Sequence, residues 1–444
     1  MPNPLTNSYL LKSATLVQLA PAKVERGDLR IAGGRVVKRG ARLLPVPGDE
    51  VIDLAGKLVL PGMVCAHTHL YSALARGMPA PVRVPTNFRE ILELVWWRLD
   101  RALDEETIYW SAVAGAMDAA RAGTTCLFDH HASPSHINGS LGIVQEALSA
   151  IGLRGALCYE ITDRDGAKKR LAGVRETRDF AHWTNVEAAQ PERQFRALIG
   201  AHASFTLSDE ALAACAAMMK ETGAGLHIHA AEDACDTTDA RANHGLGVVE
   251  RLARFDALND RTILAHGVHL SRRDIRIARR AGAWFAHNPR SNMNNQVGYA
   301  PVTEFGDRVV MGTDGIGADI FDEARFAFFK GRDARLGFTA DDWLGVLANN
   351  QRLASRTFGI EMGTLDEGAA ADLLVMDYHQ PTPLTSENLA WHFVFGMSSS
   401  AIESVMAAGR FLIRERRAAY PEAALYERSQ RAAAKLWQKL QRIR

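Results

Sequence analysis

The stretch LVLPGMVCAHTH, residues 58–69, is a short apolar run that ends in two histidines, His67 and His69. If the run is a β-strand, its side chains alternate between two faces, so both imidazoles point the same way. Two imidazoles that converge from one strand end are half of a metal site. We therefore expect the remaining ligands elsewhere in the chain.

The same pattern, an apolar run that ends at an ionisable side chain, recurs through residues 60–361. Longer segments rich in Ala, Leu, Glu and Arg separate the runs and have the texture of helices. Eight such runs end at His67, Asp129, Glu160, His202, His229, His266, His287 and Asp314. Eight parallel strands with intervening helices make a (β/α)8 TIM-like barrel, whose active site lies at the C-terminal strand ends. We therefore expect an α/β fold with this barrel over residues 60–361.

The two ends of the chain have a different texture from the middle. Short β-like segments fill residues 8–58, where Gly33 and Gly34 predict a hairpin turn, and they return after residue 362. We expect residues 1–59 and 362–420 to form one small composite β-sandwich beside the barrel. Residues 421–444 begin with Pro421 and repeat apolar residues near helical spacing, which predicts a C-terminal helix.

Composition excludes several classes of function. The 444 residues carry 52 Lys and Arg against 51 Asp and Glu, a net charge of +1 that favours neither nucleic acid nor a membrane surface as partner. No apolar run is long enough to cross a bilayer, and the first residues lack the pattern of a secretory leader. The five cysteines are scattered and form no CxxC pair. We expect a cytoplasmic protein without disulfides.

Each candidate residue also has a purely structural interpretation. A single histidine at a strand end is usually structural, and Asp314, which lies between Gly312 and Gly315, fits a turn. The spacing of His229 and Glu232 occurs by chance in many sequences. The conjunction of apt residues at the ends of strands 1, 5, 6 and 8 makes coincidence a poor explanation, and it favours a metal-dependent active site.

At these residues the sequence resembles the amidohydrolase superfamily, in its aminohydrolase and chlorohydrolase branch. The matching text lies at residues 60–69, 201–206, 226–232, 265–267, 287–293, 312–315 and 363–375. Within that branch the chain is most similar to the SsnA-type aminohydrolases, through residues 96–106, 129–134, 290–295 and 326–330. The resemblance covers nearly the whole chain.

The resemblance implies one divalent metal bound by His67, His69 and His229, with Asp314 as a further ligand. No residue matches the bridging lysine of binuclear relatives, which favours a single ion. Three imidazoles and a carboxylate suit Zn²⁺, and Fe²⁺ is the alternative.

The resemblance also implies the catalytic groups. A metal-activated water would attack an sp² carbon of a C–N bond, and ammonia or an amine would leave. Asp314 and His266 would accept the proton of the water, and Glu232 would carry a proton to a ring nitrogen and to the leaving group.

The substrate implied is a nitrogen heterocycle, purine-like or pterin-like, that reacts with water. Candidate substrate-binding residues are His202, His130, Glu160 and Arg290. For the pair Trp96-Trp97 we expect packing in the core or at a subunit interface rather than stacking on a ligand.

Three alternatives to a deaminase stay open. The same site could open the ring of a cyclic amide or act as a chlorohydrolase. A remoter alternative is a metal-binding protein without catalysis on this scaffold, although the presence of Glu232, His266 and Asp314 argues against it. By analogy with relatives we expect a homodimer.

Overall fold

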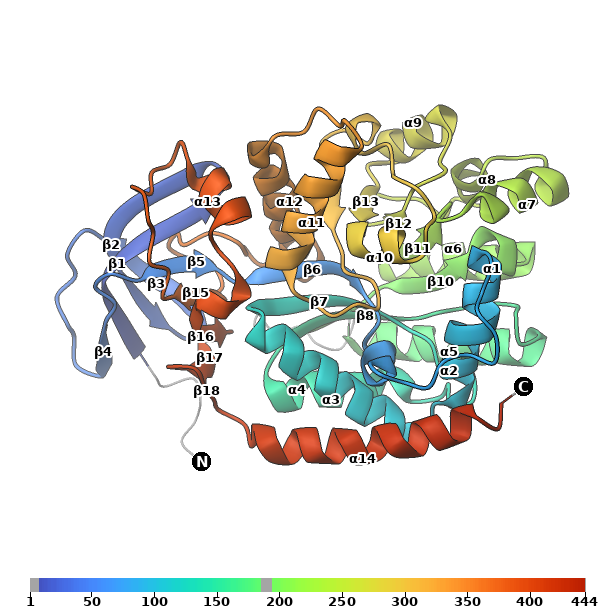
Figure 1. Ribbon diagram of the computed structural model, residues 1–444, viewed down its shortest axis with the longest axis horizontal. Helices are drawn as coiled ribbons and strands as arrows, with labels where there is room; N and C mark the ends of the chain where they lie inside the picture. Colours follow the sequence, from blue (N-terminus) through green and yellow to red (C-terminus); the bar gives the residue numbers. More distant parts are fainter. Residues whose placement is uncertain (1–7, 185–193, 444) are drawn as a thin grey trace.

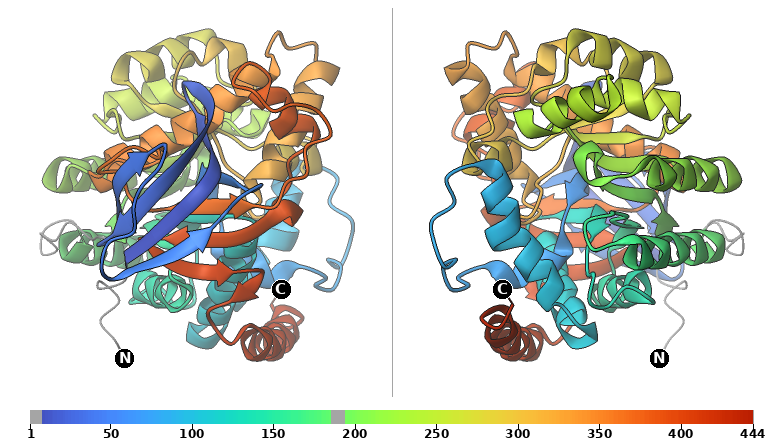
Figure 2. Two further views of the ribbon diagram at one scale, coloured as in Figure 1. Left: turned by 90° about the vertical axis from the view of Figure 1, so that its left-hand side faces the viewer. Right: turned by 90° about the vertical axis from the view of Figure 1, so that its right-hand side faces the viewer.

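The two ends of the chain build one mixed sheet of nine strands, drawn in blue and red at the left of Figure 1. The computed structural model describes residues 8–184 and 194–443. The strands of this sheet are β1 (Ser8–Leu19), β2 (Ala22–Ala32), β3 (Arg35–Gly40), β4 (Asp49–Asp53), β5 (Leu58–Pro61), β15 (Leu373–Met376), β16 (Ile402–Ala407), β17 (Arg410–Arg414) and β18 (Arg417–Ala418). Their order is β18-β17-β16-β15-β5-β1-β2-β3, with β4 beside β1. The antiparallel pair of β5 and β15 joins the N-terminal strands of this sheet to its C-terminal strands, drawn in blue and red in Figure 2.

The hairpin predicted at Gly33 and Gly34 is present between β2 and β3. Both glycines have positive φ, 55° and 74°, which side chains with a Cβ rarely adopt and a tight hairpin turn requires. The first seven residues, on which the expectation of no secretory leader rests, lie outside the described part of the chain.

Two parallel sheets occupy the middle of the chain. The first has the order β6 (Met63–Thr68), β7 (Thr124–His131), β8 (Arg154–Tyr159) and β9 (Phe195–Ala197). The second has the order β10 (Ile199–Ala203), β11 (Leu226–Ala230), β12 (Ile263–His266), β13 (Trp284–His287) and β14 (Val309–Met311). Parallel bridges connect the two sheets at both edges, between Thr68 and Asp314 and between Ile161 and Ala201.

Helices follow the parallel strands and cover their outer face, as Figure 1 shows. They are α3 (Glu105–Arg121), α4 (Ser140–Ile151), α5 (Ala167–His182), α6 (Asp209–Thr222), α7 (Ala234–His244), α8 (Val248–Arg254), α9 (Arg272–Ala281), α10 (Pro289–Asn294), α11 (Ile320–Asp333) and α12 (Ala340–Phe358). Their starts follow ordinary capping chemistry, because the side chains of Asp104, Ser271 and Thr339 accept hydrogen bonds from backbone N–H groups in the first turn.

The parallel strands are buried on both faces. Alternate residues of β6 and β7, among them Val64, Ala66, Cys126 and Phe128, pack in one cluster with Phe358 of α12. Their neighbours in sequence, such as Cys65 and Leu127, pack in the larger cluster that contains the helices. This two-sided burial explains why the strands are continuous apolar runs rather than alternating polar and apolar residues.

A long connection between β6 and α3 adds short helical pieces above the strand ends. They are η1 (Leu70–Ala75), α1 (Phe88–Ile91), a π-helical turn η2 (Leu92–Trp96) and α2 (Trp97–Ala102). The remaining elements are η4 (Ser204–Thr206), η5 (Val302–Glu304), α13 (Leu389–Phe395), η6 (Ser399–Ala401) and α14 (Glu422–Leu440).

Helix α14 covers most of the segment in which the sequence predicts a C-terminal helix, and it runs along the bottom of Figure 1. Two hydrogen bonds link this C-terminal segment to the connection between β6 and α3. The indole Nε1 of Trp437 donates to the carbonyl of Leu74 at 2.9 Å, and Nη2 of Arg98 donates to the carbonyl of Ile443 at 2.8 Å.

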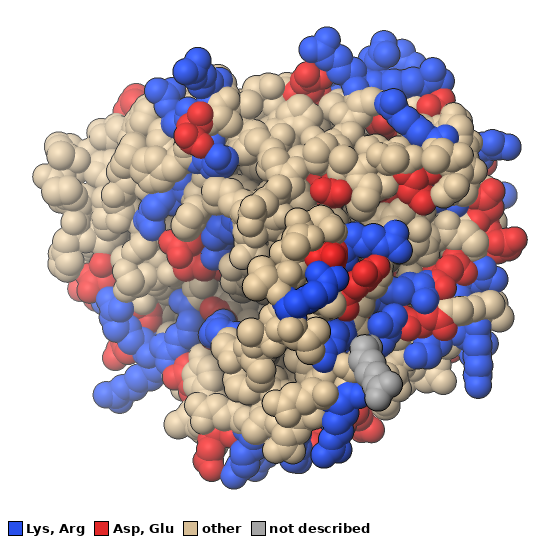
Figure 3. Space-filling model, turned by 45° about the vertical axis from the view of Figure 1, so that its right-hand side comes forward, with Lys and Arg blue, Asp and Glu red and all other residues tan. Residues whose placement is uncertain are grey.

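All five cysteines are free thiols, in agreement with the expectation of no disulfides. Among the helices of residues 8–184 and 194–443, none combines the length and the apolar character of a membrane span. Figure 3 shows cationic and anionic side chains interspersed over the face that it presents, as the near-zero net charge leads one to expect.

Candidate metal centre and active site

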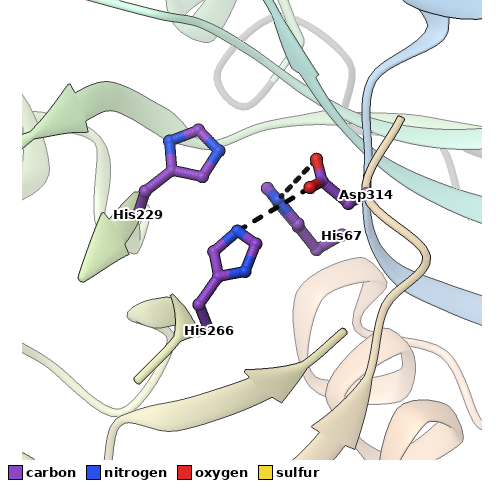
Figure 4. Close-up of side chains that lie close together, drawn as sticks. All are labelled: His67, His229, His266 and Asp314. Carbon is purple, nitrogen blue, oxygen red and sulfur yellow. Dashed lines mark ion pairs between the residues drawn. The ribbon is translucent and has the colours of Figure 1, made fainter. Parts of the chain in front are cut away.

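Five predicted site residues come together at the C-terminal ends of four parallel strands. His67 lies in β6 and His69 directly follows β6, His229 lies in β11, His266 ends β12, and Asp314 follows β14. The four histidines are buried, and Asp314 is partly exposed. Figure 4 shows His67, His229, His266 and Asp314 pointing toward one another.

Local backbone conformation turns two of these side chains toward the centre. His266 and Asp314 have φ of 71° and 52°, a left-handed conformation that costs a residue with a Cβ on the order of 1–3 kcal/mol. Backbone bonds hold them: the N–H of Asp314 donates to the carbonyl of His67 at 3.0 Å, and the N–H of Gly267 donates to that of Ala230 at 3.0 Å. Strain maintained in this way is typical of functional sites.

The potential ligand atoms are close together. Nε2 of His69 is 3.1 Å from Nε2 of His229 and 3.0 Å from Oδ1 of Asp314. Nε2 of His67 is 3.8 Å from the same carboxylate oxygen. One potential ligand atom from each of His67, His229, His266 and Asp314 lies within 4.8 Å of every other. This spacing leaves room for one cation among nitrogen and oxygen donors.

In His69 and His229, the hydrogen bond made by Nδ1 determines that Nε2 faces the centre. Nδ1 of His69 donates to the carbonyl of His130 at 2.6 Å, and Nδ1 of His229 donates to the carbonyl of His202 at 2.9 Å. With the proton on Nδ1, the lone pair of Nε2 is free to bind a metal, which is the usual arrangement around protein-bound metals. Nε2 of His67 is buried and has no hydrogen-bond partner among the described residues. These donors fit a divalent metal ion.

The environment of the centre lowers the pKa of two imidazoles and raises that of the third, which lies beside the carboxylate of Asp314. Burial, followed by the neighbouring histidines, holds the pKa of His67 and of His229 well below the usual value. Burial also opposes protonation of His69, but the hydrogen bond and charge of Asp314 outweigh it and raise the pKa of His69 to about 9. A bound cation would compete with the proton that this pair favours, because a metal binds His69 only without a proton on Nε2.

Glu232 lies beside this centre. Its Oε2 is 3.4 Å from Nε2 of His266, and its Oε1 accepts a hydrogen bond from Nδ2 of Asn295 at 3.1 Å. Burial raises the pKa of Glu232 above its usual value. The hydroxyl of Ser291 donates a short hydrogen bond to Oδ2 of Asp314. Nδ1 of His266 donates to Oδ1 of Asn292 at 2.8 Å, which orients that ring.

The centre forms the floor of a cleft with about 790 Å³ of empty space, part of it open to solvent. The cleft is lined by His69, Tyr71, Ser72, Phe88, Leu92, Trp96, Trp97, Asp100, Glu160, His202, Ala203, Phe205, His229, Glu232, Asp233, Asp236, Ser291, Asn294, Asn295, Asp314, Gly315 and Ile316.

The four residues predicted to bind substrate lie in different places. His202 and Glu160 line the cleft. His130 is fully buried behind it, with Nδ1 3.4 Å from Oε2 of Glu160. Arg290 is directed elsewhere: its guanidinium pairs with Glu323, donates to the carbonyl of Gly317 at 2.8 Å and lines a separate cleft.

Sequence reasoning missed much of the cleft wall. Trp97 packs in the main core, as the sequence leads one to expect. Trp96 and Trp97 also line the cleft, although the sequence favours packing in the core or at a subunit interface over stacking on a ligand. Nothing local in the sequence marks these indoles as wall residues. Asn295 was missed as well, although it belongs to a polar run directly after the end of strand β13. The strand-end rule that found His229 and His266 could also have found it.

The chain is similar to known proteins over most of its length. The model of the amidohydrolase family matches residues 58–412. A 5-methylthioadenosine/S-adenosylhomocysteine deaminase of Moorella thermoacetica is 30% identical over 424 residues, which cover 91% of this chain and 94% of the relative. A 5′-deoxyadenosine deaminase of Methanothermobacter thermautotrophicus is 28% identical over 399 residues, 88% of this chain and 90% of that protein.

A solved structure has the same fold. The crystal structure of an adenosine deaminase from Xanthomonas campestris with bound zinc superposes with a TM-score of 0.83, at 21% identity, and the match covers 97% of this chain and 99% of that one. The resemblance predicted from the strand-end histidines is thus confirmed by the family match. The chain belongs to the amidohydrolase family.

Proposed function

We propose that this protein is a metal-dependent aminohydrolase that removes an exocyclic amino group from a purine-like heterocycle and releases ammonia. The observation that carries the proposal is the convergence of three imidazole Nε2 atoms and Asp314 beside a buried acid, Glu232, at the floor of a cleft. Relatives named as deaminases of methylthioadenosine and 5′-deoxyadenosine, aligned over most of both chains, support it.

We propose further that the two parallel sheets are the halves of one closed (β/α)8 barrel, in which β9 and β10, separated only by Leu198, form one of the eight strands. The bridges at both sheet edges and the fold of the adenosine deaminase support this. Residues 60–361 would then form the catalytic barrel, with the sheet from residues 1–59 and 362–420 as an accessory domain. In such a barrel the strand ends that carry the histidines form the catalytic face.

One divalent ion would be held by His67, His69, His229 and Asp314. Zinc is the first choice, because imidazole and carboxylate suit it and the solved adenosine deaminase contains it. When bound, such an ion supplies Lewis acidity and lowers the pKa of water from about 15.7 to about 7. The chain's own part is to bring the four ligands together and to keep His67 and His229 neutral by burial.

The remaining residues move protons and hold the substrate. Asp314 and His266 accept the proton of the attacking water, since Nε2 of His266 is free of other partners in the described structure. Glu232 gives its proton to the ring nitrogen next to the reacting carbon, takes up the hydroxyl proton of the tetrahedral adduct and passes it to the departing amino group. The water proton held by His266, 3.4 Å away, then restores the acid. Burial raises the pKa of Glu232 toward neutrality, the range in which a proton carrier is most effective. His202 and Glu160, at the ends of β10 and β8, bind the heterocycle.

The reaction balances as water plus an aminated ring carbon giving a ring carbonyl and ammonia. The test is steady-state ammonia release by zinc-loaded protein from a panel of adenine nucleosides, guanine and pterins. Turnover of at least one amino heterocycle, with ammonia and the oxo product in equal amounts, supports the proposal. Product formed without ammonia would instead indicate ring opening or loss of another group.

A further inference from the structure

The charge of the cleft wall is one-sided. Of the side chains that line the cleft within the described part of the chain, six are carboxylates and none is a lysine or arginine. The six are Asp100, Glu160, Glu232, Asp233, Asp236 and Asp314. Aromatic rings of Tyr71, Phe88, Trp96, Trp97 and Phe205 supply much of the remaining surface. Such a wall is suited to a flat ligand that donates hydrogen bonds.

Most of these carboxylates already have a partner. Asp314 and Glu232 belong to the proposed chemistry. Asp100 pairs with Nη2 of Arg164 at 2.6 Å, and Asp236 accepts backbone hydrogen bonds at 2.8 Å and 3.0 Å. Asp233 caps helix α7. Glu160 differs from these acids, because its buried carboxylate lies beside the imidazole ring of His130 instead.

Glu160 lines the cleft and faces the imidazole ring of His130. The side chain is 4% exposed, and its Oε2 lies 3.4 Å from Nδ1 of His130. Nε2 of His130 lies 3.1 Å from the carbonyls of Ala201 and His227, so a neutral ring carries its proton there. Nδ1 of His130 has no hydrogen-bond partner among the described residues. A donor from the ligand would satisfy the Glu160 carboxylate.

Nearby cations face a different cleft. Arg89, Arg101 and Arg164 line a neighbouring cleft, and the side chains of Trp97 and Phe205 line both clefts, so they stand between the two. The guanidinium of Arg164 lies 5.0 Å from the ring centroid of Trp97 and is engaged by Asp100. Away from the proposed metal ion and the imidazoles at the floor, an anionic group in the main cleft would therefore meet carboxylates and aromatic rings.

We propose that the cleft selects heterocycles that carry no anionic group and that direct an N–H or amino donor at Glu160. This inference rests on the proposed deaminase function and narrows its substrate class. Bringing an anion beside carboxylates in a partly dry site is unfavourable, and we expect a penalty of about 100-fold. The Moorella relative is named for both methylthioadenosine and S-adenosylhomocysteine. For this chain we expect methylthioadenosine, which carries no anionic group, to be the better substrate of the two.

Matched pairs of ligands test this with the zinc-loaded, full-length protein. Adenosine is compared with adenosine 5′-monophosphate, and methylthioadenosine with S-adenosylhomocysteine, by kcat/KM and by calorimetric Kd. We expect adenosine to be favoured over its monophosphate by about 100-fold in both measurements. The penalty for S-adenosylhomocysteine should be smaller, because its ammonium group partly offsets its carboxylate.

A pair of variants locates the selectivity. Glu160→Gln keeps the shape of the side chain and removes its charge, so the penalty on the monophosphate should shrink by about 10-fold or more. The control is Glu146→Gln, an exposed acid on α4, which should keep the wild-type ratio. Zinc content and Tm establish that each variant is folded. If Glu160→Gln does not fold, the wild-type ratios still decide the proposal.

Equal or better use of the monophosphate would overturn the inference. In that case Arg101→Gln would show whether the neighbouring basic cleft binds the phosphate. Discrimination in Kd without ammonia release from any ligand would leave the inference standing and refute the deaminase function. Failure of every ligand to bind would overturn the inference itself.

Discussion

At the scale of single residues, Glu232 is the side chain on which the proposed proton transfer depends. Replacing it by glutamine keeps its size and the contact with Asn295 but removes the transferable proton. We expect kcat/KM of Glu232→Gln to fall by about 10²–10⁴-fold, with zinc content and Tm close to wild type. Glu146→Gln should have unchanged activity. Equal activity of Glu232→Gln and wild type would remove Glu232 from the mechanism.

Two buried histidines outside the metal centre make stability depend on pH. Burial lowers the pKa of His131 and of His287 to about 3, whereas in the unfolded chain both titrate near 6.5. Between these values the unfolded chain binds more protons, so their stabilising contribution is complete above about pH 6.5 and is lost as pH falls toward 3. We expect the free energy of unfolding in urea to be lower at pH 5 than at pH 7.5.

His287 allows a direct check of this pH dependence. Neither ring nitrogen has a hydrogen-bond partner in the described structure, and the ring stacks on Trp343 with centroids 5.7 Å apart. His287→Phe should therefore reduce the difference in stability between pH 7.5 and pH 5. His379→Gln, at a side chain that is 93% exposed, should leave the difference unchanged. An unaltered difference in His287→Phe would contradict the assignment.

At the scale of elements, α14 supports the connection that carries much of the cleft wall. Its Trp437 holds the carbonyl of Leu74 in η1, and η1, η2 and α2 contribute Tyr71, Trp96 and Trp97 to the cleft. Trp437→Ala should lower the free energy of unfolding by about 2–3 kcal/mol. KM should rise more than kcat falls, because the metal centre lies on other elements. Gln438→Ala, at an exposed position of the same helix, is the control.

The sequence predicted the position of some of these elements and not of others. Runs that end at His67, His229, His266 and Asp314 were recognisable because a strand buried on both faces needs apolar residues throughout, so a polar end stands out. The connection between β6 and α3 offered no comparable signal. Its helical pieces are short. Their position over the strand ends depends on contacts with α3 and α14, and one of these contacts joins Leu74 to Trp437, more than 300 residues later in the chain.

At the scale of the whole molecule, the metal centre joins strands from both parallel sheets. A metal that binds only the folded chain should stabilise it by about 4 kcal/mol at a thousandfold excess over its Kd. We expect dialysis against a chelator to lower Tm and abolish activity, and one equivalent of zinc per chain to restore both. Elemental analysis that finds two tightly bound ions per chain would contradict a single site.

The sequence by itself determined the family, the strand-end histidines and the location of the reactive groups. It could do so because strand periodicity and chain order place ligands such as His67 and His69 on one face and at one end of the parallel strands. Only the tertiary structure decided that Arg290 pairs with Glu323 away from the cleft, that Trp96 and Trp97 form its wall, and that Nε2 of each ligand histidine faces the centre. These outcomes depend on which distant groups accept a hydrogen bond or provide a packing surface, and no local pattern encodes such partners.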